Sequence, residues 1–141
     1  MSFTARIVDW SSEEQTLRMI RETVFIMEQD VHEDEEFDGR DPDCLHVLVR
    51  DNKDRPIATA RLLPDGKVGR MAVLRHWRKK GVGSAMLIKL FVEARIRGLK
   101  QLSADAQVRA LPFYEKHGFR VVSDEFMDAR IPHKKVIKDL T

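Results

Sequence analysis

The sequence predicts a single α/β domain, residues 1–141, built on one mixed, mostly antiparallel sheet. Three observations lead to this fold class. A chain of 141 residues has the length of one ordinary domain and can bury a core without disulfides or metals. Apolar residues that alternate with a strand-like period are interleaved with others that recur at helical spacing. No internal repeat, and no linker rich in glycine or proline, divides the chain.

The first two elements are expected to be a strand and a helix. Phe3–Val8 alternates apolar and polar residues, as a strand with one buried face does. Ser11 and Glu14 have the spacing of a capping box, which predicts that a helix begins at Ser11. Four apolar residues recur at helical spacing and predict one buried stripe: Leu17, Ile20, Val24 and Met27.

An acidic segment follows, from Glu28 to Asp43. It holds nine Asp and Glu against one Arg, and Gly39 and Pro42 interrupt any regular period, so we expect a functional loop or a short helix within a loop. The rest of the chain holds 24 Lys and Arg against 14 Asp and Glu, a net charge of +10. This asymmetry predicts either a body that binds an anion and a loop that receives a cation, or simply a solvated acidic loop.

The middle of the chain predicts an antiparallel meander and a helix. Leu45–Val49 and Pro56–Leu63 are strand-like and are joined by a polar hairpin turn. A second turn at Pro64-Asp65-Gly66 leads to a third strand, Lys67–Leu74. Gly81–Arg95 predicts a helix that is apolar almost all round and therefore well buried, and Gly98 fits its C-terminal cap. The later elements are expected at Leu99–Ala106 (strand), Arg109–His117 (helix), Phe119–Val122 (strand) and Ile131–Leu140 (strand).

The segment Val73–Ser84, VLRHWRKKGVGS, carries the clearest functional pattern. A strand ends, a basic turn follows, and glycines lead into a helix, whose first N–H groups have no partner inside the helix and attract phosphate. Gly81 and Gly83 allow a phosphate to approach the backbone closely. Positive charge is added by Arg75, Arg78, Lys79 and Lys80.

Two common phosphate-binding motifs do not fit this segment. The P-loop requires Gly-Lys-Ser/Thr, which is missing, and the dinucleotide-binding motif requires a third glycine where the chain has Met86. The turn Arg78-Lys-Lys-Gly81-Val-Gly83 instead resembles the Arg/Gln-x-x-Gly-x-Gly/Ala turn of the GCN5-related N-acetyltransferase (GNAT) family. Leu111–Arg120, LPFYEKHGFR, resembles the second motif of the same family, Phe-Tyr-Glu-Lys-x-Gly-Phe.

The N-terminal third resembles a narrower group. Arg21–Gln29, RETVFIMEQ, together with Ile131-Pro132-His133, is similar to the ElaA/YjcF-like bacterial subgroup of these transferases. A related Arg-x-x-Val-Phe pattern occurs in acyl-homoserine lactone synthases, which share the fold.

The resemblance implies a GNAT fold in which two parallel strands, Lys67–Leu74 and Leu99–Ala106, splay apart and admit the pantetheine arm of acetyl-CoA. The earlier strand would pair with the arm, and the turn before the following helix would hold the pyrophosphate. Gln107 stands where relatives carry an Asn that binds pantetheine. The implied donor site comprises Met71, Ala72, Val73, Arg78, Lys79, Lys80, Gly81, Val82, Gly83, Ser84 and Gln107.

The family reaction is direct attack of an amine on the acetyl thioester. A backbone N–H near Val73 would stabilise the oxyanion, and Tyr114, a phenol with an unperturbed pKa of about 10, would protonate the thiolate. The strand before the turn, KVGRMAVL, lacks the glutamate that many relatives use as a base. The first candidates for that role are His133 and Glu28. Further candidates are His32, His46 and the carboxylates within residues 33–38.

The sequence therefore predicts a cytoplasmic N-acetyltransferase that moves the acetyl group of acetyl-CoA to a primary amine of a small cationic acceptor, with the acidic segment near that acceptor. Two alternatives stay open: an acyltransferase like the acyl-homoserine lactone synthases, and a non-catalytic CoA-binding sensor. The resemblance also leaves homodimerisation open.

Other function classes are not supported by the sequence. The five His and one Cys are dispersed and predict no metal site. Neither stacking aromatics nor a groove-reading helix favours nucleic acid. The longest apolar run, residues 85–92, is interrupted by Lys89, which argues against a membrane span, and no signal peptide is visible. The single cysteine, Cys44, cannot form an internal disulfide, which favours the cytoplasm.

Overall fold

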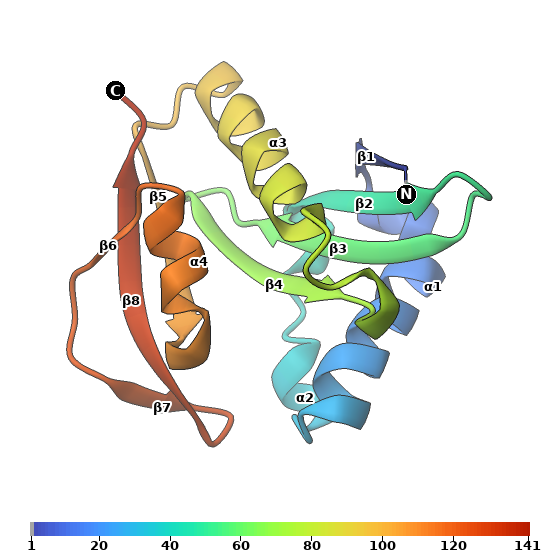
Figure 1. Ribbon diagram of the computed structural model, residues 1–141, viewed down its shortest axis with the longest axis horizontal. Helices are drawn as coiled ribbons and strands as arrows, with labels where there is room; N and C mark the ends of the chain where they lie inside the picture. The colour runs from blue at the N-terminus through green and yellow to red at the C-terminus, as the bar shows by residue number, and fades with distance from the viewer. Residues whose placement is uncertain (1) are drawn as a thin grey trace.

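The computed structural model describes residues 2–141, and its strands form one sheet with helices on both faces (Figure 1). The strand order is β1-β2-β3-β4-β5-β8-β6, and β7 pairs with β8. Among the described residues every strand pair is antiparallel except β4 with β5, which confirms the predicted α/β fold. The strands are β1 (Phe3–Val8), β2 (Leu45–Asp51), β3 (Pro56–Leu62), β4 (Lys67–Val73), β5 (Gln101–Gln107), β6 (Arg120–Val121), β7 (Phe126–Asp128) and β8 (Ile131–Asp139).

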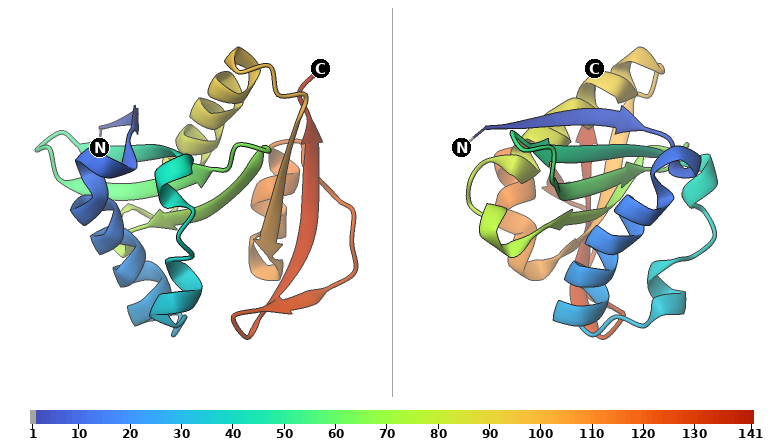
Figure 2. Two further views of the ribbon diagram at one scale, coloured as in Figure 1. Left: turned by 180° about the vertical axis from the view of Figure 1, so that it is seen from behind. Right: turned by 90° about the vertical axis from the view of Figure 1, so that its right-hand side faces the viewer.

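Two long helices sandwich the first half of the sheet. The helix α1 packs on one face of β2–β4 and α3 on the other, while α4 covers β5 and β8 (Figures 1 and 2). Each face has its own core of buried apolar side chains, one built around α1 and one around α3. The helical segments are α1 (Trp10–Arg21), η1 (Glu22–Glu28), α2 (Glu33–Glu36), η2 (Asp41–Asp43), η3 (Arg75–Trp77), α3 (Val82–Ile96), η4 (Val108–Ala110) and α4 (Leu111–Lys116).

The first helix begins differently from the prediction. Its N-cap is Asp9, with no side-chain cap bond, and Ser12 donates to the Asp9 carbonyl at 3.3 Å. The capping box expected at Ser11 is therefore wrong, because Glu14 pairs with Arg18 one turn later, at 2.9 Å. Such a pair at a spacing of four residues stabilises the exposed face of a helix.

The predicted stripe on this helix is confirmed for Leu17, Ile20 and Val24 but wrong for Met27. The first three are buried, whereas Met27 is 78% exposed. The reason is that residues 22–28 form a π-helix, whose wider turn rotates later side chains out of register. Phe25 takes the buried place instead, and Met27 turns toward the cleft described below.

The helix α3 is less buried than its sequence predicts. Val82, Met86 and Leu90 face the core, but its outer face exposes Ile88, Val92 and Ile96 by 53%, 51% and 72%. An apolar residue on a helix is thus not always a core residue, and the prediction of a helix buried all round is wrong. The predicted C-terminal cap is confirmed.

Gly98 has φ +79°, and the N–H of Leu99 donates to the Ala94 carbonyl at 3.0 Å. The later elements shift by a few residues from their predicted ends, and β7 was not expected. The acidic segment does contain a short helix, α2, within a loop.

The two parallel strands part almost at once. Only Lys67 with Ser103 and Val68 with Ala104 are paired, and beyond them β4 and β5 diverge. Gly66 precedes this junction with φ +99°, and a Cβ there would lie 2.7 Å from the Gln101 carbonyl oxygen. Only glycine fits so close to the neighbouring strand. The splayed strands implied by the resemblance are therefore present.

Candidate functional site

A cleft of about 1130 Å³ opens where β4 and β5 diverge. Its walls are β4, the turn into α3, the ends of β5 and α4, the π-helix η1, α2, and the turn between β7 and β8. Every residue of the implied donor site except Ala72 and Lys80 lines this cleft, as do Tyr114, His133 and Glu28. Of the further candidate bases, Glu35 and Glu36 line the cleft, whereas His32, His46 and the other carboxylates within residues 33–38 do not. The side chain of Ala72 lies in the core below α1, so only its backbone borders the strand edge. Lys80 donates to the His76 carbonyl at 2.8 Å.

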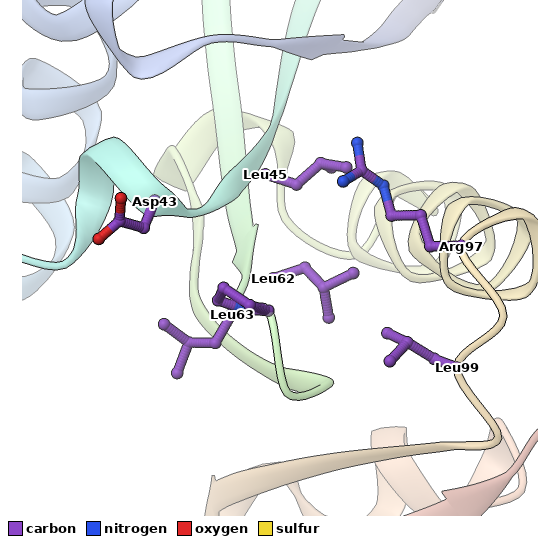
Figure 3. Close-up of a pocket in the computed structure, with 7 residues that line it drawn as sticks. Asp43, Leu45, Leu62, Leu63, Arg97 and Leu99 are labelled. Carbon is purple, nitrogen blue, oxygen red and sulfur yellow. The ribbon is translucent and has the colours of Figure 1, made fainter.

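A second, smaller hollow of about 210 Å³ lies near the end of α3 (Figure 3). Its floor is aliphatic, with Leu45, Leu62 and Leu99 among its residues, and its charged groups are Asp43 and Arg97. None of the residues predicted to be catalytic or donor-binding lines this hollow. We therefore place the candidate site in the larger cleft.

The edge of β4 that faces the cleft is shaped by a bulge. Opposite β3, Gly69 pairs with Arg61 and Ala72 with Thr59, so β4 has an extra residue between them. Arg70 lies in that bulge with φ +49°, a conformation that no sequence pattern indicated. Its side chain donates to the backbone carbonyls of Glu35 and Glu36 at 3.2 and 3.1 Å, and so fastens α2 to the cleft wall.

Beyond the bulge, the backbone of Val73 faces the cleft. The Leu74 N–H donates to the Ile57 carbonyl of β3, and backbone groups alternate in direction along a strand, so those of Val73 point away from β3. The Val73 carbonyl accepts a hydrogen bond from Arg78 Nε at 2.8 Å. Its N–H is left facing the cleft, where the sequence analysis placed an oxyanion donor.

The basic turn after β4 ends at the N-terminus of α3. Gly81 is the N-cap residue, with φ +84°, a conformation that only glycine adopts without strain. Val82, Gly83 and Ser84 form the first turn, and their N–H groups have no acceptor within the helix. Positive side chains on this part of the lining are Arg75, Arg78, Lys79 and Lys116. The arrangement suits a bound anion.

One residue of this region was missed. His117 Nε2 lies 2.8 Å from the hydroxyl of Ser84 and joins α4 to the first turn of α3. Partial burial lowers the pKa of His117, helped by the nearby Lys116 and Lys138, so the ring is neutral at pH 7. The Phe-Tyr-Glu-Lys-His-Gly-Phe run gave no signal for this contact, because the pairing depends on how the two helices pack.

Tyr114 lies deep in the cleft. Its ring packs edge-on against Phe113 and Phe119, and its hydroxyl lies 3.5 Å from the sulfur of Met71 on β4. Burial raises the pKa of Tyr114 to about 12. The phenol therefore keeps its proton at neutral pH and can donate it within the cleft.

His133 and Glu28, the two candidate bases, differ in their partners. His133 is 8% exposed, stacks on Phe126, and donates from Nδ1 to the Ile131 carbonyl at 2.7 Å. In the neutral form of the ring, that bond makes Nε2 the acceptor nitrogen. The carboxylate of Glu28 instead accepts a bond of 2.7 Å from Arg78. The carboxylate of Glu28 is thus occupied by Arg78, whereas no hydrogen bond engages Nε2 of His133 among the described residues.

Gln107, at the end of β5, bridges the cleft. Its amide nitrogen donates to the side chain of Gln29 in the segment after η1, at 2.9 Å, and its oxygen accepts from Arg109 at 2.8 Å. In this structure, the amide of Gln107, which was predicted to contact pantetheine, is hydrogen-bonded to other side chains of the protein. A ligand that used the Gln107 amide would replace the bond to Gln29.

The acidic segment is mostly neutralised by arginine. Glu36 and Asp41 are each 3% exposed and share Arg21, which is itself 1% exposed, at 2.7 Å each. The remaining contacts close a cycle of alternating charges, which we call the arginine–carboxylate ring. Its members, in order, are Arg21, Glu36, Arg70, Asp38, Arg61 and Asp41.

This ring changes the interpretation of the acidic segment. Two of the ring's three carboxylates, Glu36 and Asp41, are buried, and all three are paired, so they are neither a solvated loop nor a free receptor for a cation. Instead they hold α2 and η2 against β3 and β4. Two other candidate bases are also engaged. Glu35 pairs with Arg130 at 3.0 Å. His46, on β2, is buried against Asp41 and Trp10.

Within residues 2–141, no group of three or more His, Cys, Asp and Glu side chains is placed to hold a metal ion. Nor does any helix there have both the length and the apolar character needed to cross a membrane.

Comparison with known proteins agrees with this geometry. The family described as acetyltransferase (GNAT) domain matches residues 12–140. The uncharacterized N-acetyltransferase YjcF of Bacillus subtilis is 40% identical over 124 residues, which cover 85% of this chain and 88% of YjcF. Among solved structures, Escherichia coli ElaA has a TM-score of 0.86 and 26% identity, covering 96% of this chain and 99% of ElaA. A Lactobacillus plantarum protein has a TM-score of 0.90 and 25% identity over 100% of both chains. The chain therefore belongs to the GNAT family of acetyltransferases, and within it to the ElaA/YjcF-like group.

Proposed function

We propose that this protein transfers the acetyl group of acetyl-CoA to the primary amine of a small, cationic acceptor. Membership of the GNAT family makes it an acyltransferase and implies an acyl-CoA donor. The observation that carries the finer proposal is the early divergence of β4 and β5. It leaves the backbone of Val73 facing a cleft that ends at the N-terminus of α3.

The donor fits this cleft from one end to the other. The pyrophosphate would lie on the first turn of α3, where the N–H groups of Val82–Ser84 and the surrounding cations favour an anion. The pantetheine arm would follow the edge of β4 along Met71–Val73. Its reactive end would then lie between Val73 and Tyr114, and the residues present fit each part of the molecule.

The residues of the cleft supply each requirement of the reaction. The amine nitrogen forms a bond to the thioester carbonyl carbon and loses a proton, which His133 Nε2 accepts. The Val73 N–H donates to the oxygen that becomes negative, an interaction of about 3 kcal/mol in such sites. The carbon–sulfur bond breaks, and Tyr114 gives its proton to the departing sulfur. Its raised pKa of about 12 keeps that proton available at neutral pH.

The first experiment measures thermal shifts with acetyl-CoA, free CoA and ATP at equal concentrations. A ligand that binds only the folded state adds about 2.7 kcal/mol at a hundredfold excess over its Kd. Both CoA species should stabilise the wild type, and ATP should not. Gly81→Glu should abolish the shift, while the matched control Gly98→Glu, with φ +79° and equally open space at the other end of α3, should keep it.

Transfer assays then separate the alternatives. The wild type should acetylate small primary amines, and Tyr114→Phe should bind acetyl-CoA normally but turn over about a hundredfold more slowly. A clear preference for longer acyl donors would favour a reaction like that of the lactone synthases. Binding of CoA without transfer to any amine would favour a sensor, and no binding of either CoA species would overturn the proposal.

A further inference from the structure

The hairpin of β7 and β8 forms the wall of the cleft that faces η1 and α2. Its turn residues, Ala129 and Arg130, have φ +48° and +66°, which is typical of a tight two-residue turn but strained for residues other than glycine. Arg130 holds this turn in place. It donates to the carboxylate of Glu35 at 3.0 Å and to the carbonyl of Asp30 at 3.1 Å. The hairpin is therefore anchored across the cleft.

Asp128, the last residue of β7, lines the cleft and is exposed to it. Within the described residues no lysine, arginine or histidine lies in ion-pair range of its carboxylate, and no hydrogen bond engages it. The other carboxylates of the cleft lining each have a cation: Glu28 has Arg78 at 2.7 Å, Glu35 has Arg130 at 3.0 Å, Glu36 has Arg21 at 2.7 Å, and Asp105 has Lys67 at 2.6 Å. The uncompensated negative charge of the cleft is thus concentrated at Asp128.

The strand register places Asp128 beside His133. Asp128 is opposite Ile131, and Phe126 is opposite His133, so the side chains of all four lie on the same face of the hairpin. Asp128 and His133 are diagonal neighbours in this ladder, a relation in which residues are about 7–8 Å apart. Ile131, which also lines the cleft, provides an apolar surface between them.

We propose that Asp128 is the residue that determines acceptor specificity, by binding a second cationic group of the acceptor. This inference rests on the proposed function. The reacting nitrogen must be neutral and close to His133, whereas a second ammonium, a few bonds away, keeps its charge and pairs with Asp128. The acceptor class is then a primary amine with a second positive charge, joined by a short apolar chain that crosses Ile131.

The test compares two amines with the same four-carbon chain: putrescine, which has a second ammonium group, and butylamine, which lacks it. We expect the wild type to acetylate putrescine with a kcat/KM, counted per primary amine, at least about fivefold above that for butylamine. Asp128→Asn should remove this preference by lowering the value for putrescine only, and Asp128→Lys should reverse it. Asp124→Asn removes the same charge from an exposed residue outside the cleft lining, and should change neither value.

The outcomes distinguish the two proposals. If the wild type acetylates both amines but Asp128→Asn keeps the wild-type preference, the role of Asp128 is overturned while the acetyltransferase proposal stands. If the wild type binds acetyl-CoA but acetylates neither of these amines nor any other amine tested, the proposed function itself is overturned. Thermal shifts with acetyl-CoA on each variant confirm that the donor site is intact, so that a lost preference reflects the acceptor side.

Discussion

Arg78 and Glu28 are joined by a hydrogen-bonded ion pair of 2.7 Å that links the basic turn after β4 to the π-helix on the opposite wall of the cleft. The pair fixes the guanidinium that also donates to the Val73 carbonyl. It also occupies the carboxylate that the sequence offered as a base. We therefore expect different roles for the two candidate bases: His133 accepts the proton, and Glu28 positions Arg78.

Separate substitutions of His133 and Glu28 test these two roles. His133→Gln should lower kcat about a hundredfold with little change in the KM for acetyl-CoA, because it removes the proton acceptor. Glu28→Gln should lower kcat by less than about tenfold and raise the KM for acetyl-CoA, because Arg78 loses its orientation. Steady-state kinetics with one amine decides the matter. A larger loss of kcat in Glu28→Gln would assign the base to Glu28.

Tyr114 can be titrated directly, because it is the only tyrosine in the chain. Its pKa of about 12 in the folded protein and about 10 when unfolded mean that the folded state keeps the proton longer. The stability associated with the protonated phenol is fully present below pH 10 and is lost as the pH rises toward 12, by about 3 kcal/mol. Phenolate absorbance should show a midpoint near 12 in buffer and near 10 in urea. Equal midpoints would show that the ring is not buried.

The arginine–carboxylate ring predicts a large effect of a single substitution. Arg61→Met removes one of the two arginine partners of the buried Asp41 and of Asp38, and should lower the free energy of unfolding by about 3 kcal/mol. The control is Arg120→Met, which removes a 57% exposed arginine from its pair with Asp139, itself 55% exposed, and should cost at most about 1 kcal/mol. Urea unfolding measures both. Equal losses would mean that Arg61 in the ring contributes no more to stability than an arginine in a surface ion pair.

The same ring sets the response to acid. The hydrogen bond from Arg61 holds the pKa of Asp38 well below its usual range. The stability from this carboxylate is present above about pH 4 and is lost as the pH falls, because the unfolded chain takes up the proton first. Arg61→Met should therefore show a shallower loss of stability on acidification than the wild type. Parallel curves would argue against the contribution of Asp38.

His117 predicts a separate pH dependence at milder acidity. Its folded-state pKa lies below the ordinary value of about 6.5, so the unfolded chain binds the proton first and this part of the stability is lost as the pH falls. Protonation of the ring would also leave only a donor nitrogen to face the Ser84 hydroxyl. An NMR titration should give His117 a midpoint below the ordinary histidine value of about 6.5. A midpoint at or above that value would contradict the burial of the ring.

The sequence predicted those parts of the fold and site that depend on local chemistry. A local requirement of the backbone determines each of three features: Gly81 at a helix start, the alternation along Phe3–Val8, and the turn at Gly66. Tyr114 and the basic turn were found because their motifs are contiguous. In these cases the neighbours along the chain supply most of the environment that fixes the conformation.

The remainder depends on contacts between distant segments. The π-helix at residues 22–28 rotates Met27 outward, although the apolar spacing continues to favour an α-helix. The left-handed Arg70 is stabilised by carbonyls more than thirty positions away. The arginine–carboxylate ring draws its members from five separate elements and one loop, so the acidic segment looked solvated when its charges were counted along the sequence. Asp128 was missed because the strand that carries it is short and lacks an apolar pattern.

The brief pairing of β4 with β5 leaves two strand edges inside the molecule, beyond Val68 and Ala104. Exposed edges of this kind are templates on which other chains can add strands and aggregate. Here each edge lies within a cleft lined by charged side chains, including the paired Lys67 and Asp105 at its narrow end. Charged side chains beside a strand edge disfavour its pairing with a strand of another chain. The charges that line the divergence of β4 and β5 thus protect the protein against self-association through these two edges.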